Sequence, residues 1–241
     1  QLAARHPYKK WLNEGRFAIE SSFDTDSIDI EGTLSREQIK TYMKMFQVSF
    51  EERDQVLRPL AEGGQEAVGS MGDDTPMAVL STRQRNLFDF FRQQFAQVTN
   101  PPIDPLREAV VMSLGVELGR EGSIFKEQSY LGQRIGLSSP VLSPRKYYAL
   151  KNNEYSEFPV QKFDLNYDPQ TESLKQAVQR VCKEVEASVR GGTVVCILSD
   201  HSLIEGKLPI HTLMAVGAVH SHLIDTGLRC DTNLVASTGY A

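Results

Sequence analysis

The chain has 241 residues, of which 40% are hydrophobic and 24% are charged, as is usual for a globular protein with a full core. Its formal net charge is −5, and Lys and Arg are dispersed without a basic stripe, which argues against nucleic acid as a partner. No apolar run approaches the roughly 20 residues of a membrane-spanning helix, so we expect no membrane partner.

The three cysteines, Cys182, Cys196 and Cys230, are widely separated along the chain. Their spacing matches no metal motif, and an odd number does not form a disulfide framework. Cys182 and Cys196 fall in apolar surroundings, so we expect them to pack as small hydrophobic residues. This usage predicts a reducing cytoplasm.

The chain begins at Gln1 without a signal-peptide pattern and ends just after an apolar segment, so we expect a fragment of a longer polypeptide. Residues 1–32 are mixed and polar, with the acidic run SSFDTDSIDIEG at 21–32. We interpret them as a lead-in segment that wraps or links without building a core. A partly mobile linker is an equally good interpretation.

Two helices are predicted next. Ser35 is placed to cap a helix that runs to about Phe46. Ser49 and Glu52 then form a capping box that opens a second helix. Pro59 is expected to strain this helix, and the glycine pair 63–64 to end it.

The segment 67–80 begins as a loop. Gly72, Asp73 and Asp74 could hold a magnesium ion, but Asp side chains also close turns on their own backbone, and we favour the turn. The sequence MAVL at 77–80 predicts a short buried strand. Residues 86–96 predict a helix with a core-facing stripe, formed by Leu87, Phe88, Phe91 and Phe95.

The stretch FAQVTNPPIDPLRE at 95–108 places three prolines within five residues. Pro101 prevents the preceding helix from continuing, and Asp104 can cap a new helix with Pro105 at its first position. The connector VTNPP, residues 98–102, is therefore predicted to be a rigid loop between two packed helices. Stiffness reduces the entropy lost on ordering, so we expect the loop to hold a shape that another part of the protein touches.

Residues 115–168 predict a short strand, a turn, a short helix from about Pro144, and an alternating strand within 158–167. The last third predicts a helix over 174–189, a continuous apolar strand at 193–200, a helix over 209–224 and an apolar strand at 232–237. This alternation predicts an α/β fold with parallel-strand βαβ units.

Asp200 and His201 follow the apolar strand, at the edge of a parallel sheet where active sites collect. We favour a simpler interpretation, in which Ser199 or Asp200 caps the loop and His201 is exposed, because catalysis needs convergent partners. His220 and His222 look like a metal pair. Residues two apart on a helix point in different directions, so we favour a structural or surface role.

No Walker loop, dinucleotide fingerprint or nucleophile elbow occurs in the chain. No Ser, Cys or Lys has the sequence context of a covalent catalyst. The spacing of residues therefore predicts a scaffold, with no catalytic, cofactor-binding or metal-binding residue of its own.

Two segments, GQEAVGSMGDDTPMAVLS at 64–81 and FRQQFAQVTNPPIDPLREAVVMSL at 91–114, closely resemble the large subunit of the glutamate synthase family. RCDTNLVASTGYA at 229–241 is similar to that family's approach to its next domain. The resemblance covers essentially the whole chain. It implies that residues 33–241 are the central domain, which joins an N-terminal glutamine amidotransferase domain to an FMN-binding synthase domain.

The resemblance also implies a fold, a whole-enzyme reaction and partners. The domain is expected to be a rudimentary, incomplete TIM-barrel-like domain with an N-terminal helical segment and no flavin site. The whole enzyme makes glutamate from glutamine and 2-oxoglutarate. It uses FMN, an iron–sulfur cluster, and NADPH through a small subunit that carries FAD, as in typical bacterial enzymes, with ferredoxin as the alternative donor. The partners are the two flanking domains and the small subunit.

In this family the central domain supplies part of the wall of an ammonia tunnel. We hypothesise that Thr99 and Asn100, with Pro101 and Asp104 beside them, face that passage or its gate. A competing hypothesis is that the segment only docks on the synthase domain. Two other functions stay open at this point: a free-standing α/β enzyme that uses Asp200 and His201, and a purely structural interdomain module.

Overall fold

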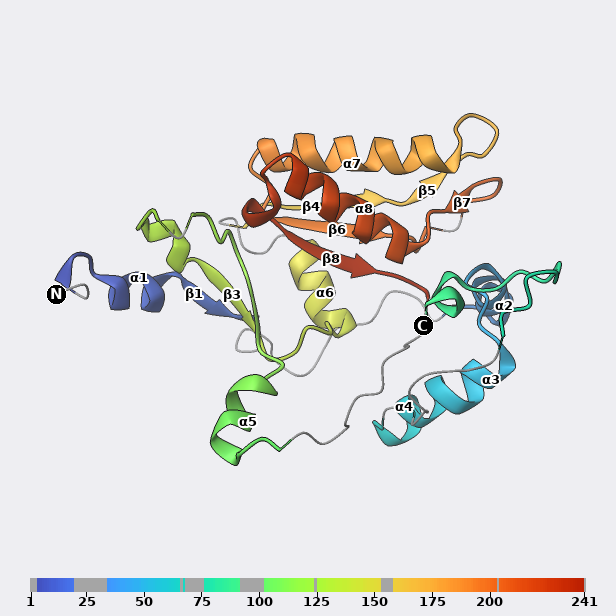
Figure 1. The fold of residues 1–241 in the computed structure, drawn as a ribbon, viewed down its shortest axis with the longest axis horizontal. Coiled ribbons are helices and arrows are strands. Elements are labelled where there is room, and N and C mark those ends of the chain that lie inside the picture. The colour runs from blue at the N-terminus through green and yellow to red at the C-terminus, as the bar shows by residue number, and fades with distance from the viewer. Residues whose placement is uncertain are drawn as a thin grey trace. The chain divides into compact units, whose positions relative to one another are not determined.

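The structure is a computed structural model that describes residues 4–19, 34–65, 67, 76–91, 102–123, 125–152, 158–202 and 204–240 (Figure 1). The chain divides into two compact units. Unit 1 comprises residues 1–32 and 113–238, and unit 2 comprises residues 33–112 and 239–241. Each unit is described by itself.

Unit 2 begins with the two predicted helices, and both capping predictions are confirmed. Helix α2 (Arg36–Met45) starts after Ser35, whose side chain accepts from the backbone N–H of Gln38 in a capping box. Ser49 and Glu52 form the second capping box, at the start of α3 (Phe50–Glu52). Phe46 follows α2, is almost fully buried, and packs edge-on against the ring of Tyr240.

The second predicted helix contains a wider, π-helical turn just before Pro59. After α3 the chain forms a π-helical turn, η3 (Arg53–Leu57), and then continues as α4 (Arg58–Gly63). A regular α-helix would drive the ring of Pro59 into the carbonyl of residue 55, so a wider turn at this point relieves the predicted strain. Gly64 ends the helix in the left-handed conformation, as predicted, with φ +60°.

Three other predictions for unit 2 are corrected. Residues 77–80 form a turn in place of a buried strand, and Leu80 is 94% exposed. In place of the predicted helix 86–96, a 3₁₀ turn, η4 (Leu87–Phe90), ends at the extended Phe91, and residues 92–96 lie outside the described residues. Helix α5 (Pro105–Val111) begins where predicted but is not packed, since Leu106 is 86% exposed. The hydrophobic patterns of these segments predicted burial that the structure does not show.

Unit 1 is built on a parallel sheet of three strands in the order β4-β6-β8. The strands are β4 (Val160–Asp164), β6 (Val195–Ser199) and β8 (Asn233–Ser237), joined by helix α7 (Leu174–Arg190) and helix α8 (Thr212–Asp225). The predicted α/β class with parallel strands is confirmed. Only β6 is buried along its whole length, whereas β8 is partly exposed and differs from the predicted buried strand.

The two faces of β6 enter two separate hydrophobic clusters. Cys196 and Leu198 pack in one cluster with α7 and α8, whereas Val195 and Ile197 pack in the other with Leu150 of α6 (Pro144–Lys151). Figure 1 shows α7 and α6 on opposite sides of the strands. The prediction that Cys182 and Cys196 pack as small hydrophobic residues is confirmed, because both are buried and free.

A second sheet has the order β1-β3-β2 and lies in the same unit. Strand β1 (Arg16–Ala18) pairs in parallel with β3 (Arg134–Leu137), which pairs antiparallel with β2 (Val116–Leu118). Two short strands, β5 (Asn166–Tyr167) and β7 (Leu208–Pro209), pair antiparallel elsewhere in the unit, and a last 3₁₀ turn, η6 (Arg229–Asp231), precedes β8.

The expectation that residues 1–32 build no core is wrong for residues 4–19. Ile19 is fully buried, directly after β1. Helix α1 (Tyr8–Gly15) lies against η5 (Ser129–Gly132), where a Cβ at Gly132 would stand 2.6 Å from the carbonyl oxygen of Trp11. Glycine is required for so close an approach of two backbones. Residues 20–33 lie outside the described residues, and the assignment of 1–32 as a lead-in from another domain stays a prediction.

No closed barrel occurs in the described part of unit 1, so the TIM-barrel-like form of the prediction is not confirmed. Within the same residues, no helix combines the length and the apolar character that crossing a bilayer requires.

The packing of α8 gives a first prediction. Leu223 is fully buried against α7, whereas its neighbour Ile224 is 54% exposed. We expect Leu223→Ala to lower the free energy of unfolding by about 2–5 kcal/mol, because it removes buried methyl groups and leaves a cavity. The matched control Ile224→Ala should change it by about 0.5 kcal/mol or less in urea titrations. Equal losses in the two variants would contradict the assigned core.

A polar bridge between α7 and α8 gives a second, pH-dependent prediction. Glu186 contacts Arg190 at 2.8 Å and His222 at 2.7 Å, and hydrogen bonds from Arg190 and then His222 lower the pKa of its carboxyl below the ordinary 4.5. A lowered folded pKa means that the ionised form adds stability above the unfolded pKa, and that this is lost as the pH falls through the folded pKa.

We therefore expect Glu186→Gln to destabilise the protein at about pH 6, and the difference from wild type to shrink by about pH 3. Urea unfolding at both pH values measures the change. Glu184→Gln is the control, because Glu184 pairs with Arg180 on its own helix. A difference that stays constant over this range would refute the bridge as a source of stability.

Candidate functional site

The predicted tunnel-facing connector is described only at its downstream end. Thr99, Asn100 and Pro101 lie outside the described residues, so their proposed role stays a prediction. Asp104 is the N-cap of α5, and its Oδ1 accepts from the backbone N–H of Leu106 at 3.0 Å and of Arg107 at 2.9 Å. The predicted helix start is confirmed, and it fixes the backbone where the connector ends.

A second candidate site lies at the carboxyl end of β6. Asp200 directly follows the strand and is fully buried. Its Oδ2 accepts a hydrogen bond from the Thr212 hydroxyl at 2.5 Å and another from the Thr238 hydroxyl at 2.7 Å. Its backbone N–H donates to the carbonyl of Ser237. One carboxylate thus joins the end of β6 to the start of α8 and the end of β8.

The residues around Asp200 agree with the simpler of the two sequence interpretations. The Ser199 hydroxyl accepts from the backbone N–H of His201 at 3.5 Å, and His201 is exposed. Asp200 itself is fully buried. His211 caps α8 through its ring nitrogen, and desolvation lowers the pKa of this ring although the charge of Asp200 opposes the shift. The sequence predicted the position of Asp200 at the strand end but not its threonine partners.

The geometry around Asp200 favours a structural lock over acid–base chemistry. A carboxyl group that accepts from two hydroxyls is held in one orientation.

The histidine pair does not converge on one point. His222 contacts Glu186 on α7, whereas Nδ1 of His220 accepts from Nε of Arg229 at 2.9 Å. Among the described residues, no group of three or more His, Cys, Asp or Glu side chains is placed to hold a metal ion. The possible magnesium turn at Gly72, Asp73 and Asp74 lies outside these residues.

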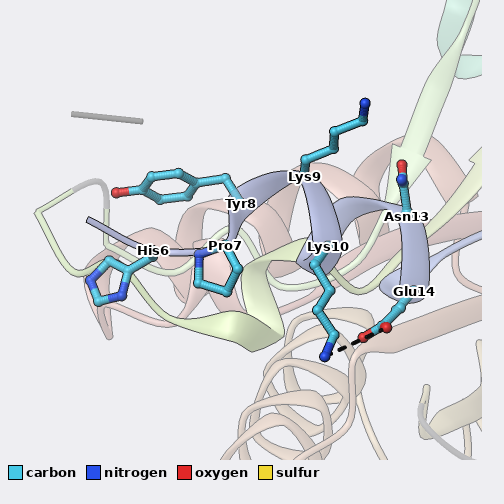
Figure 2. A pocket seen from close by; sticks show the side chains of 7 residues that line it. All are labelled: His6, Pro7, Tyr8, Lys9, Lys10, Asn13 and Glu14. Atoms are coloured by element: carbon cyan, nitrogen blue, oxygen red, sulfur yellow. Dashed lines mark ion pairs between the residues drawn. The ribbon is translucent and has the colours of Figure 1, made fainter. Parts of the chain in front are cut away.

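A hollow lies on the surface of α1 (Figure 2). Its volume is about 700 Å³, and the lining residues that the structure describes all come from the single segment 6–14. Figure 2 shows Lys10 directed toward Glu14, with which it forms an ion pair at 3.9 Å, while Lys9 points away from that pair. Side chains from one helix alone do not enclose a ligand, so this hollow is not a candidate active site.

Comparisons with known proteins agree with one another. A family profile described as "Glutamate synthase central domain" matches residues 41–241. Glutamate synthase [NADPH] large chain of Bacillus subtilis is 37% identical over 241 residues, which cover 100% of this chain and 15% of the relative. Glutamate synthase [NADH] of Schizosaccharomyces pombe is 33% identical over 251 residues, covering 100% of this chain and 12% of the relative.

The chloroplastic ferredoxin-dependent glutamate synthase of Oryza sativa subsp. japonica is 38% identical over 241 residues, covering 98% of this chain and 15% of that protein. The chain therefore spans a small part of the length of the relatives that it matches. Their names differ in the electron donor, so the comparisons do not select one donor for this protein.

The lock at Asp200 gives a third prediction. Thr212→Val should lower the free energy of unfolding by about 1.5–3 kcal/mol, because it removes a donor from a buried carboxylate while keeping the side-chain volume. Thr212→Ser keeps the hydroxyl and is the matched control, with a smaller loss. Chemical denaturation of both variants measures the effect. A Val variant as stable as the Ser variant would show that the bond to Asp200 contributes nothing.

Proposed function

The chain belongs to the glutamate synthase family as its central domain, and we propose that it connects a glutamine amidotransferase domain to an FMN-binding synthase domain and forms part of an ammonia tunnel. The observation that carries this proposal is the family match over residues 41–241, in a chain that spans only about 15% of its bacterial relative. The matched region is a small part of the relative's length, so we propose that other domains of the same polypeptide flank it.

The activity of the whole protein is proposed on the same ground. The complete polypeptide makes glutamate from glutamine and 2-oxoglutarate, with its catalytic centres in the flanking domains. NADPH, delivered through a small subunit with FAD, is the donor that we propose. NADH and ferredoxin forms occur among the relatives, so a donor assay on the complete protein decides between them. The free cysteines support a reducing cytoplasm as its location.

The cysteines of the described residues do not fit the iron–sulfur cluster of such an enzyme. Cys182 lies in α7, Cys196 in β6 and Cys230 in η6, and the first two are buried. Burial raises the pKa of the Cys182 and Cys196 thiols, which disfavours the thiolates that an iron–sulfur cluster needs. We therefore propose that the cluster and the FMN are bound outside this chain.

The order of the strands supports an incomplete barrel as the finer description of the fold. Along the chain, β4, α7, β6, α8 and β8 alternate, and the strands neighbour one another in the same order in which they occur. A (β/α) barrel keeps this sequential order throughout, and one half of a doubly wound sheet shares it up to the switch point. We propose that the sheet β4-β6-β8 corresponds to part of such a barrel.

A tunnel role for the connector is supported at its downstream end. Asp104 caps α5 and Pro105 occupies its first position, so the backbone leaving the connector has a fixed direction. Leu106 and Val110 of α5 are 86% and 76% exposed, and exposed apolar groups of this kind are typical of contact surfaces. We propose that a flanking domain of the same polypeptide covers them and closes the passage beside Thr99 and Asn100.

The fourth prediction tests the passage in the full-length enzyme. We expect Thr99→Trp to obstruct the passage, so that less glutamate forms per glutamine hydrolysed, while synthesis from added ammonia continues. Thr99→Val should cause a smaller loss of coupling, because it removes only a hydroxyl. Thr171→Trp is the control, since Thr171 is an exposed threonine on a loop of unit 1.

Full coupling of hydrolysis to synthesis in both Thr99 variants would refute the tunnel role. If these variants stay coupled but hydrogen exchange in 95–108 slows only when the flanking domains are present, the segment serves as a docking contact alone.

A further inference from the structure

A small pocket lies at the amino ends of the parallel strands, away from the Asp200 edge. Phe158 and Pro159 directly precede β4, and Val194 directly precedes β6; all three line the pocket. Its volume is about 190 Å³. Drug-sized ligands occupy roughly 300–1,000 Å³, so this pocket suits a smaller molecule.

One wall of the pocket is an arginine held by the backbone of another segment. Nη2 of Arg120 donates to the carbonyl oxygen of Gly192 at 2.7 Å, and Gly192 adopts a positive φ of +107° in the turn before β6. The carbonyl of Arg120 accepts from Nη1 of Arg134, and the preceding N–H of Gly119 donates to Oδ1 of Asn233 at 2.7 Å. The guanidinium is therefore pre-positioned, which lowers the entropy cost of binding.

The charge of this arginine is not balanced within the described part of the chain. Neither Arg120 nor Arg134 pairs with a carboxylate there, although both are half-buried. The buried Nε–H of Arg120 makes no hydrogen bond among these residues. A guanidinium partly withdrawn from water without a counter-ion is unfavourable, and an anion in the pocket would relieve that cost.

The other walls indicate which anion fits. Phe158 and Val194 are each 5% exposed and form an apolar floor, while Tyr130 is 37% exposed and Gln133 adds an amide. Arg120 is the one charged group among the described lining residues. Phosphate sites commonly use several backbone N–H groups of a helix N-terminus or nest, which this lining does not supply.

We infer that this pocket binds a small organic carboxylate, with its anionic end on Arg120 and its apolar body against Phe158 and Val194. One guanidinium matches one carboxylate in charge and in planar geometry. The site lies at the opposite ends of the strands from Asp200, and all of its described lining residues belong to unit 1. Binding there would stabilise the turn between α7 and β6, because Gly192 of that turn already bonds Arg120.

The fifth prediction tests this site in the full-length protein with 4-fluorobenzoate, followed by fluorine NMR. We expect saturable binding to wild type, and affinity at least about tenfold weaker in Arg120→Gln, because a charge-assisted hydrogen bond is lost. Arg16→Gln is the matched control and should bind as wild type does, since Arg16 is an exposed arginine paired with Glu117 in the same unit. The uncharged 4-fluorobenzamide should bind much more weakly.

Two further measurements keep the test decisive if Arg120→Gln does not fold. In wild type, 4-fluorobenzoate should slow hydrogen exchange at 119–121 and 192–194. Tyr130→Ala, at the exposed mouth, should weaken binding without disturbing the contact between Arg120 and Gly192. The inference is overturned by any of three results: no binding at about 10 mM probe, equal affinity in folded Arg120→Gln and wild type, or tighter binding of inorganic phosphate than of the carboxylate.

Discussion

The burial of β6 on both faces is the constraint on which the rest of unit 1 depends. All five residues of the strand are buried, and its side chains alternate between the cluster under α7 and α8 and the cluster beside α6. A strand covered on both sides needs its polar backbone fully paired, which parallel neighbours on both edges, β4 and β8, provide. The helices α7 and α8 must then cross over the sheet between successive strands, and this sets the order β4, α7, β6, α8, β8 along the chain.

The two ends of this strand have different electrostatic arrangements. At the carboxyl end, the buried side chain of Asp200 accepts from two threonine hydroxyls, which fixes its orientation inside the fold. At the amino end, Arg120 lies beside the turn at Gly192, and no carboxylate of the described residues pairs with it. At the carboxyl edge, where enzymes of this fold class usually bind ligands, the side chain that directly follows β6 is thus bonded within the fold.

Local signals in the sequence were reliable, and long-range ones were not. The caps at Ser35, Ser49 and Asp104 and the continuous apolar run of β6 were predictable, because each depends on residues within one turn or one strand. The threonine partners of Asp200 lie 12 and 38 residues away, and no spacing rule connects them. The apolar stretch 77–80 was misassigned because hydrophobic character alone does not say whether a partner surface exists. Strand β1 was missed because three residues in a polar segment carry no periodic signal.

Strand β1 also shows that the limits of a conserved sequence profile need not be the limits of a fold. The profile begins at residue 41, yet β1 pairs with β3 and Ile19 fills the cluster beneath it. A protein trimmed to the profile would leave one edge of β3 without its partner and would open a gap beside Ile135. The close backbone contact between Gly15 and Gly132 would be lost with that segment. Any excised form of this domain therefore has to begin well upstream of residue 41 to keep its interior intact.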